Sequence, residues 1–169
     1  MEFKLKTITK SGVAEAISKV ELYRYLNEPE EAESICRDIL AVDPHNQLAS
    51  RLLGLTLTDQ FTGGEGDRYA EALKIFQSLT DGYEQLYYTG IAHERRAKAQ
   101  LRRGQLPHTL VVLFEEAMCC FAEAEKTRPP DNDDAILRWN RCVRLLQSLP
   151  GVEWEKELAA FDAGDSPPT

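Results

Sequence analysis

The segment Ala72-Leu-Lys-Ile-Phe76-Gln-Ser-Leu79 decides the fold, because two other segments of the chain, 32–39 and 117–124, repeat its pattern. In each segment an alanine is followed by a larger apolar side chain four residues later and by another apolar residue seven residues later. A helix brings residues with these spacings onto one face. The three segments therefore predict three helices that pack in the same manner.

A second set of small residues precedes these segments. Leu53-Gly54 lies before the second segment, and Thr89-Gly90 lies before the third. A small residue at the point where two helices cross lets them approach closely, and the larger apolar residue fills the space beside it. Each repeated helix is therefore expected to form a hairpin with the helix before it.

Proline, glycine and helix-capping residues divide the chain into helices with apolar residues at helical spacing. Pro29 suits the first turn of a helix, and Pro44 and Pro129 each follow the alanine of a repeated segment by twelve residues. Asp131 or Asn132 is expected to cap the last long helix. The predicted helices span 13–26, 29–42, 46–60, 68–79, 83–103, 107–128 and about 132–149.

This arrangement resembles the tetratricopeptide repeat family, whose repeats have a Leu-Gly step in the first helix, Ala-x-x-x-aromatic in the second and a closing proline. The resemblance covers residues 13–149 and implies an all-α solenoid of three hairpins with a C-terminal cap. The repeated alanines lie 40 and 45 residues apart, against about 34 in the family, and the second excess predicts an elongated third hairpin. Lys19-Val20 and Arg138-Trp139 replace the Leu-Gly step in the first and last units.

The ends of the chain are expected to differ from this helical repeat domain. Residues 1–12 form an N-terminal arm, residues 150–161 a short capping helix, and residues 162–169 a disordered tail. A stripe made of Trp154, Leu158 and Phe161 on the short helix either covers the last repeat or joins two copies into a homodimer.

Charge and composition argue against several partners and locations. The formal net charge is −8, which repels the phosphates of nucleic acids and anionic lipids. The chain has neither a secretory signal in residues 1–12 nor an apolar stretch of about 20 residues, so a cytoplasmic location is expected. The four cysteines form no CxxC pair and are expected to be small buried hydrophobes.

Sequence motifs for catalysis and metal binding are incomplete. His93-Glu94-Arg95-Arg96-Ala97 begins like the HExxH helix of zinc proteases, but Ala97 stands where the second histidine is required. The glycines of segment 63–66 are followed by no Gly-Lys-Ser/Thr, which argues against a phosphate-binding loop. We therefore expect no catalytic residues, no metal site and no cofactor.

The resemblance also implies a binding groove, because the first helices of successive tetratricopeptide hairpins line a concave surface. The stripes expected to face this groove mix arginine, tyrosine and aliphatic side chains, as interface hot spots do; the alternative is that some of them form core between neighbouring repeats. The residues are Ile17, Glu21, Arg24, Arg51, Leu55, Thr58, Tyr87, Ile91, Glu94, Asn140 and Arg144.

Basic residues are concentrated in residues 95–103. They either complement the dipole at the C-terminal end of a helix or form a docking patch for an acidic segment of a partner. This patch comprises Arg95, Arg96, Lys98, Arg102 and Arg103. The positions with which some family members clamp the C-terminal carboxylate of chaperones carry no basic residue here. They hold Ile17, Glu21, Leu52, Glu84 and Tyr88, so no such clamp is expected.

The function predicted from these features is that of a non-catalytic protein–protein interaction module, which holds a peptide or helix of a partner protein in its groove. Two alternatives stay open: a self-assembling structural subunit, and a helical small-ligand binder or enzyme that uses space beneath the elongated hairpin.

Overall fold

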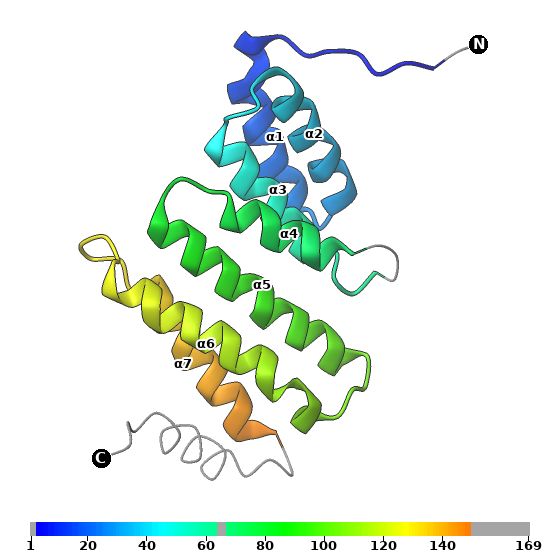
Figure 1. Ribbon diagram of the computed structural model, residues 1–169. Helices are drawn as coiled ribbons and strands as arrows, with labels where there is room; N and C mark the ends of the chain where they lie inside the picture. The colour runs from blue at the N-terminus through cyan, green and yellow to red at the C-terminus, as the bar shows by residue number, and fades with distance from the viewer. Residues whose placement is uncertain (1–2, 64–66, 150–169) are drawn as a thin grey trace.

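The computed structural model describes residues 3–63 and 67–149, which form an all-α structure (Figure 1). No β-strand occurs within these ranges, and short 3-10 helices at Lys10–Gly12 and Pro107–Leu110 precede two of the α-helices. The α-helices are α1 (Val13–Tyr25), α2 (Pro29–Val42), α3 (Gln47–Asp59), α4 (Arg68–Gln77), α5 (Gly82–Arg102), α6 (Val111–Lys126) and α7 (Asp134–Ser148).

Capping side chains fix the beginnings of several helices. The side chains of Asn46, Asp67 and Asp81 accept hydrogen bonds from backbone N–H groups in the first turns of α3, α4 and α5, at 2.9, 3.1 and 2.9 Å. Such bonds satisfy N–H groups that have no partner within the helix. Pro29 occupies the first position of α2, as predicted.

Two helices begin at least two residues later than predicted. α7 begins at Asp134, because Asp131 adopts a left-handed backbone conformation with φ 61° and so extends the turn. Asn132 accepts a hydrogen bond from the backbone N–H of Asp134 at 2.9 Å, although it lies outside the helix. The segment that follows Pro107 first forms a 3-10 turn, and α6 begins at Val111.

The repeated small and large residues meet at the helix crossings. Ala32, Ala72 and Ala117 are completely buried, as the packing argument requires. A Cβ atom added to Gly54 of α3 would lie 2.3 Å from the ring of Phe76 on α4. At Gly90 of α5 the corresponding distance to the ring of Phe121 on α6 would be 2.7 Å. Only glycine allows these rings to lie so close to the neighbouring helix.

The first helical pair packs with different side chains. Val20 of α1 and Cys36 of α2 occupy the positions at which the next two pairs have glycine and phenylalanine, and both are completely buried in one core cluster. Valine is larger than the glycine of the other pairs, and cysteine is smaller than their phenylalanine, so the increase in size on α1 is offset by a decrease on α2. This exchange accounts for the missing Leu-Gly step at Lys19-Val20.

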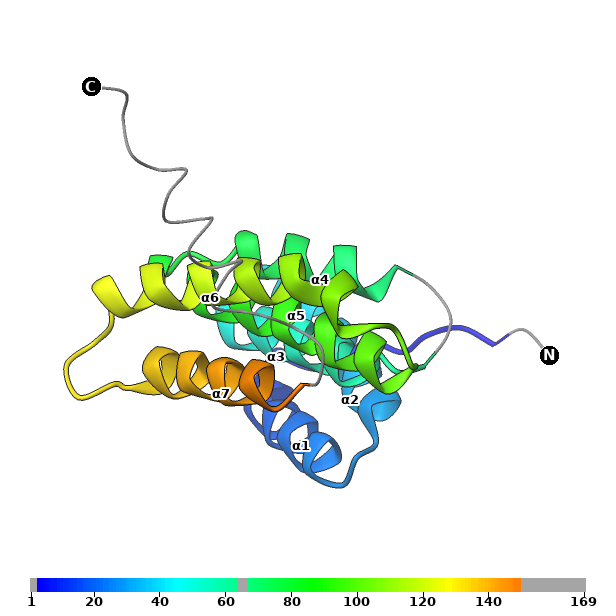
Figure 2. The same cartoon turned by 90° about the horizontal axis from the view of Figure 1, so that it is seen from below.

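Consecutive helices pack against each other along the chain, and α3 also contacts α1 and α5. Figure 2 shows α1 and α7 on the same side of α4 and α6, with α3 and α5 between them. The core consists of two clusters, one centred on α1 to α4 and the other on α5 to α7, and Leu55 and Tyr88 pack against both. Both helices of the third pair were expected to be elongated: α5 has 21 residues and α6 has 16, against 10 to 14 in α1 to α4.

The four cysteines do not share one environment. Cys36 and Cys142 are buried, Cys120 is half-buried and Cys119 is exposed. The expectation that all four are buried is therefore wrong for Cys119, because it lies on the outer face of α6, between the buried Met118 and Phe121 in sequence. The predicted cap (150–161), tail (162–169) and stripe of Trp154, Leu158 and Phe161 lie outside the described residues.

Candidate functional site

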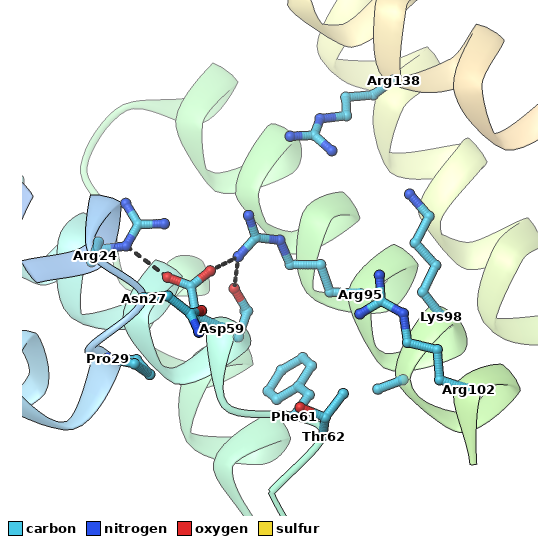
Figure 3. A pocket seen from close by; sticks show the side chains of 12 residues that line it. Arg24, Asn27, Pro29, Asp59, Phe61, Thr62, Arg95, Lys98, Arg102 and Arg138 are labelled. Atoms are coloured by element: carbon cyan, nitrogen blue, oxygen red, sulfur yellow. Dashed lines mark hydrogen bonds and ion pairs between the residues drawn. The ribbon is translucent and has the colours of Figure 1, made fainter.

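A pocket of about 370 Å³ opens between α1, α3, α5 and α7 (Figure 3). Each of these helices contributes at least one charged side chain to its lining. We call it the basic pocket and define it by the residues Arg24, Thr58, Asp59, Arg95, Lys98, Arg102 and Arg138.

Asp59, near the end of α3, holds two arginines on one wall of the basic pocket. Arg24 of α1 donates a hydrogen bond from Nε to Asp59 Oδ2 at 2.8 Å, and Arg95 of α5 forms an ion pair with the same carboxylate. Arg95 also donates to Thr58 Oγ1 at 2.6 Å, and Thr58 Oγ1 donates to the backbone carbonyl of Leu55 at 2.7 Å. These contacts fix the Arg95 guanidinium between α3 and α5.

Glu94 holds two other cations of the pocket lining, although it does not itself line the pocket. Its side chain is completely buried and forms ion pairs with Lys98, one turn further along α5, and with Arg138 of α7 at 3.4 Å. A buried carboxylate of this kind requires cationic partners, because an unpaired buried charge is strongly destabilising. Glu94 therefore connects α7 to α5 at the site.

The basic pocket carries an excess of positive charge. Its lining includes five cationic side chains, and only two carboxylates, those of Asp59 and Glu94, pair with them. The cations are Arg24, Arg95, Lys98, Arg102 and Arg138. The side chain of Arg102 makes no hydrogen bond or ion pair within residues 3–63 and 67–149. The excess contrasts with the charge of −8 on the whole chain.

The pKa of Arg95 reflects this crowding. Burial lowers the pKa of the guanidinium, Asp59 opposes the shift, and Arg24 and Arg138 lower the pKa further. Burial also lowers the pKa of Arg138, but Glu94 and Tyr87 outweigh that effect and hold it above its ordinary value. The local potential is therefore positive at Arg95, so that an anionic group placed beside it would be stabilised.

The structure corrects several expected groove residues. Thr58, Tyr87, Ile91 and Glu94 are all buried, and of the four only Thr58 lines the basic pocket. Tyr87 stacks on Tyr83 with ring centroids 5.6 Å apart, and Tyr87 and Ile91 belong to the second core cluster. The prediction failed here because α5 has neighbours on several sides, so that a stripe expected to face the groove faces core.

The other expected groove residues are dispersed. Arg24 lines the basic pocket, whereas Ile17 lines a separate hollow beside Val13 and Val42. Arg51 forms an ion pair with Glu84 and lies over the Tyr88 ring, 5.8 Å from its centroid. The remainder comprise Leu55 and Asn140, which are half-buried, and Glu21 and Arg144, which are exposed.

The predicted basic patch divides between two surfaces of α5. Arg95, Lys98 and Arg102 line the basic pocket, while Arg96 and Arg103 line a smaller hollow. Arg96 lies 5.4 Å from the centroid of the Tyr69 ring, and Arg103 donates a hydrogen bond to the carbonyl of Phe61 at 3.0 Å.

Sequence reasoning missed two residues of the basic pocket, Asp59 and Arg138. Asp59 follows the expected groove residue Thr58, and Arg138 lies two residues before Asn140. The acidic Asp59 at the end of α3 and the basic Arg138 on α7 could have indicated that these helices make charged contacts. The pairing itself depends on distances that spacing within one helix does not provide.

The incomplete HExxH segment is used for packing. His93 Nδ1 lies 2.8 Å from Tyr69 Oη and 3.1 Å from Glu116 Oε2. Burial lowers the pKa of His93, and Glu116 opposes the shift. Within the described residues, no three His, Cys, Asp or Glu side chains are grouped closely enough to hold a metal ion. No helix in those same ranges combines the length and the hydropathy needed to cross a bilayer.

Comparisons with protein-family models, with curated proteins and with solved structures give no match for this chain.

Proposed function

We propose that this chain is a non-catalytic protein–protein interaction module, a cytoplasmic α-solenoid of the tetratricopeptide type. In this proposal α1/α2, α3/α4 and α5/α6 are its hairpins, α5 lengthens the third, and α7 caps the last. The close contacts of Gly54 with Phe76 and of Gly90 with Phe121 support the family, because they recur at equivalent positions of two successive pairs.

One observation carries the functional part of the proposal. The basic pocket is lined by α1, α3 and α5, the first helices of the proposed hairpins, and by the proposed cap α7. In a solenoid of this type the first helices line the groove. The pocket is open and mostly polar, and ion pairs hold four of its five cationic side chains. An open polar hollow suits a peptide or helix better than a small apolar ligand, which favours an enclosed apolar cavity.

Self-assembly is a second candidate, favoured by apolar residues on the outer face of α1. Leu22, Tyr25 and Leu26 are exposed, with 88% of Tyr25 accessible to solvent. A second copy covering this face would bury apolar surface. Light scattering tests this idea: a dimer that Tyr25→Glu converts to a monomer would support self-assembly, and a wild-type monomer would reject it.

The interaction proposal is tested by obstructing the basic pocket without changing its charge. Thr62 is exposed and lines the pocket, so Thr62→Trp places a bulky ring at its edge. Gln77→Trp on α4 is the matched control, because Gln77 is also exposed and lies outside the pocket lining. Each variant is used as bait in affinity capture from cell lysate, with quantification of every protein retained.

The expected result is a set of proteins retained by the wild type and by Gln77→Trp but lost from Thr62→Trp. Circular dichroism of all three baits establishes that they are equally folded. Identical sets for the three baits would contradict the use of this pocket for partner binding.

A further inference from the structure

We propose that the partner segment bound in the basic pocket is an acidic peptide, recognised through several carboxylates along its length. This inference rests on the proposed function, because it names the chemistry of the partner for the same pocket. The charge balance is its starting point: five cations line the pocket and only two carboxylates pair with them, so the pocket keeps unneutralised positive charge.

The internal carboxylates act as positioning groups for the cations. Asp59 is shared by Arg24 and Arg95, and Glu94 is shared by Lys98 and Arg138. Each carboxylate thus orients two cationic side chains while neutralising only one unit of charge. The cations are held in position before a ligand arrives, which reduces the entropy lost on binding.

The spacing of the cations favours a chain of carboxylates over a single anionic group. Arg95, Lys98 and Arg102 follow one another along one face of α5, and a rise of about 1.5 Å per residue separates the first and last Cα atoms by roughly 10 Å. In Figure 3 Arg24 lies across the pocket from this row, and Arg138 approaches from α7. One phosphate could contact only part of this set, whereas successive acidic residues of a peptide could contact most of it.

Arg102 is the side chain most available to the ligand. It is exposed at the pocket and makes no hydrogen bond or ion pair within the described part of the chain. The other four cations each have a carboxylate partner already. A ligand carboxylate would therefore meet Arg102 without displacing an internal one.

The charge of the whole molecule favours an acidic peptide over a nucleic acid. The chain carries −8 although the pocket is positive, so the surface outside the pocket is more acidic still. A nucleic acid that extends beyond the pocket would meet that surface and be repelled. A short acidic segment can place its charges within the pocket and continue with neutral residues outside it.

The test uses the full chain and a fluorescent peptide rich in aspartate and glutamate, acetylated and amidated at its ends. The reference peptide has asparagine and glutamine at the same positions. By anisotropy, the acidic peptide is expected to bind at least about tenfold more tightly, with an affinity that falls as salt is added. Amidation ensures that binding does not depend on a terminal carboxylate.

Two charge-reversing variants then locate the binding. Arg102→Glu is expected to weaken binding of the acidic peptide by about fivefold or more, because a favourable contact becomes a repulsive one. Lys74→Glu on α4 changes the net charge equally at an exposed residue outside the pocket lining and is expected to stay within about twofold of wild type. Circular dichroism verifies that both variants are folded.

Three results would overturn the inference. They are equal binding of the acidic and neutral peptides, equal effects of Arg102→Glu and Lys74→Glu, and tighter binding of a single-stranded oligonucleotide of equal charge. If Thr62→Trp nevertheless loses a partner that Gln77→Trp retains, the interaction module stands and only the acidic character of its partner is wrong.

Discussion

Gly54 of α3 lies against the ring of Phe76 of α4, so closely that a Cβ atom on Gly54 would be 2.3 Å from Phe76 Cε1. Phe76 is completely buried, and its ring has a stacked neighbour in Tyr88 at 5.5 Å. The ring therefore has little space to move. The absence of a side chain at Gly54 is what permits α3 and α4 to approach this closely.

The variant Gly54→Ala is expected to lower the free energy of unfolding. Alanine favours a helix by about 1 kcal/mol over glycine, which would raise stability at an unobstructed position. Here the added methyl group overlaps the Phe76 ring, and overpacking of this kind typically costs about 1–3 kcal/mol. The net effect by these figures is expected to be a loss of up to about 2 kcal/mol, measured by urea denaturation.

Gly82→Ala is the matched control for Gly54→Ala. A Cβ at Gly82, the first residue of α5, would have no atom within 4 Å, so this variant is expected to be as stable as wild type or more so. Replacing the Phe76 ring by the smaller side chain of leucine, in the double variant Gly54→Ala/Phe76→Leu, should recover part of the unfolding free energy lost in Gly54→Ala. Equal stability of the two alanine variants would refute the close-contact explanation.

Thr56 and Thr58 provide a paired prediction about buried hydroxyl groups. Thr56 Oγ1 is buried without a hydrogen-bond partner, whereas Thr58 Oγ1 donates to the Leu55 carbonyl and accepts from Arg95. Thr56→Val is expected to be neutral or to stabilise by up to about 1 kcal/mol, because it removes an unsatisfied polar group. Thr58→Val should destabilise by about 1–2 kcal/mol, because it leaves Arg95 with one partner fewer. Thermal and urea unfolding of both variants would reveal the opposite signs.

Glu33 is expected to make stability depend on pH. Its side chain accepts hydrogen bonds from Gln60 at 2.8 Å, from Arg37 at 2.7 Å and from Arg68 at 2.6 Å. Burial raises the pKa of Glu33, but these donors outweigh it and hold the pKa below its ordinary value of 4.5. A carboxyl group whose pKa is lower in the folded state contributes stability above its unfolded pKa, and this contribution is lost as pH falls through the folded value.

Glu33→Gln is therefore expected to lose about 1–2 kcal/mol of unfolding free energy at neutral pH, because hydrogen bonds to a charged group are stronger than those to an amide. The difference from wild type should shrink as pH falls below 4.5. Glu15→Gln, which removes an exposed ion pair with Lys19, should change stability by less than about 0.5 kcal/mol. A difference for Glu33→Gln that is independent of pH would contradict the role of its charge.

The cysteines are expected to differ in their reactivity. Burial raises the pKa of the Cys36 and Cys142 thiols to about 12 and that of Cys120 to about 11, so few of these groups are thiolates at neutral pH. Because the thiolate is the nucleophile, a disulfide reagent should modify the exposed Cys119 first and the others only after denaturation. The fast reaction should disappear in Cys119→Ser; if it persists, the burial pattern of the thiols is wrong.

The helices could be predicted because their signals are local. Pro29 and the capping residue Asp81 act within a few residues of their own positions, and the repeated segments fix the face on which Ala72 and Phe76 lie. The predicted starts of α7 and α6 were less accurate, because a turn at Asp131 and a 3-10 turn after Pro107 come before these helices. There the backbone follows the geometry of the turn, which sequence spacing does not express.

The site was predicted only in part, because it joins side chains from helices that are far apart in sequence. Arg24 and Lys98 were recognised as charged residues on expected faces, but each was assigned to a different surface. Tyr87 and Ile91 were expected to face a partner and instead complete the core, since α5 is covered on more sides than its own periodicity reveals.

The sequence by itself determined that this protein is all-α and where most of its helices begin and end, because caps, prolines and apolar periodicity act over one or two turns. Tertiary structure alone decided that Asp59 would hold Arg24 and Arg95 together, and that Glu94 would be buried between Lys98 and Arg138. These ion pairs depend on the distances between α1, α3, α5 and α7, and the spacing of residues within one helix does not determine those distances.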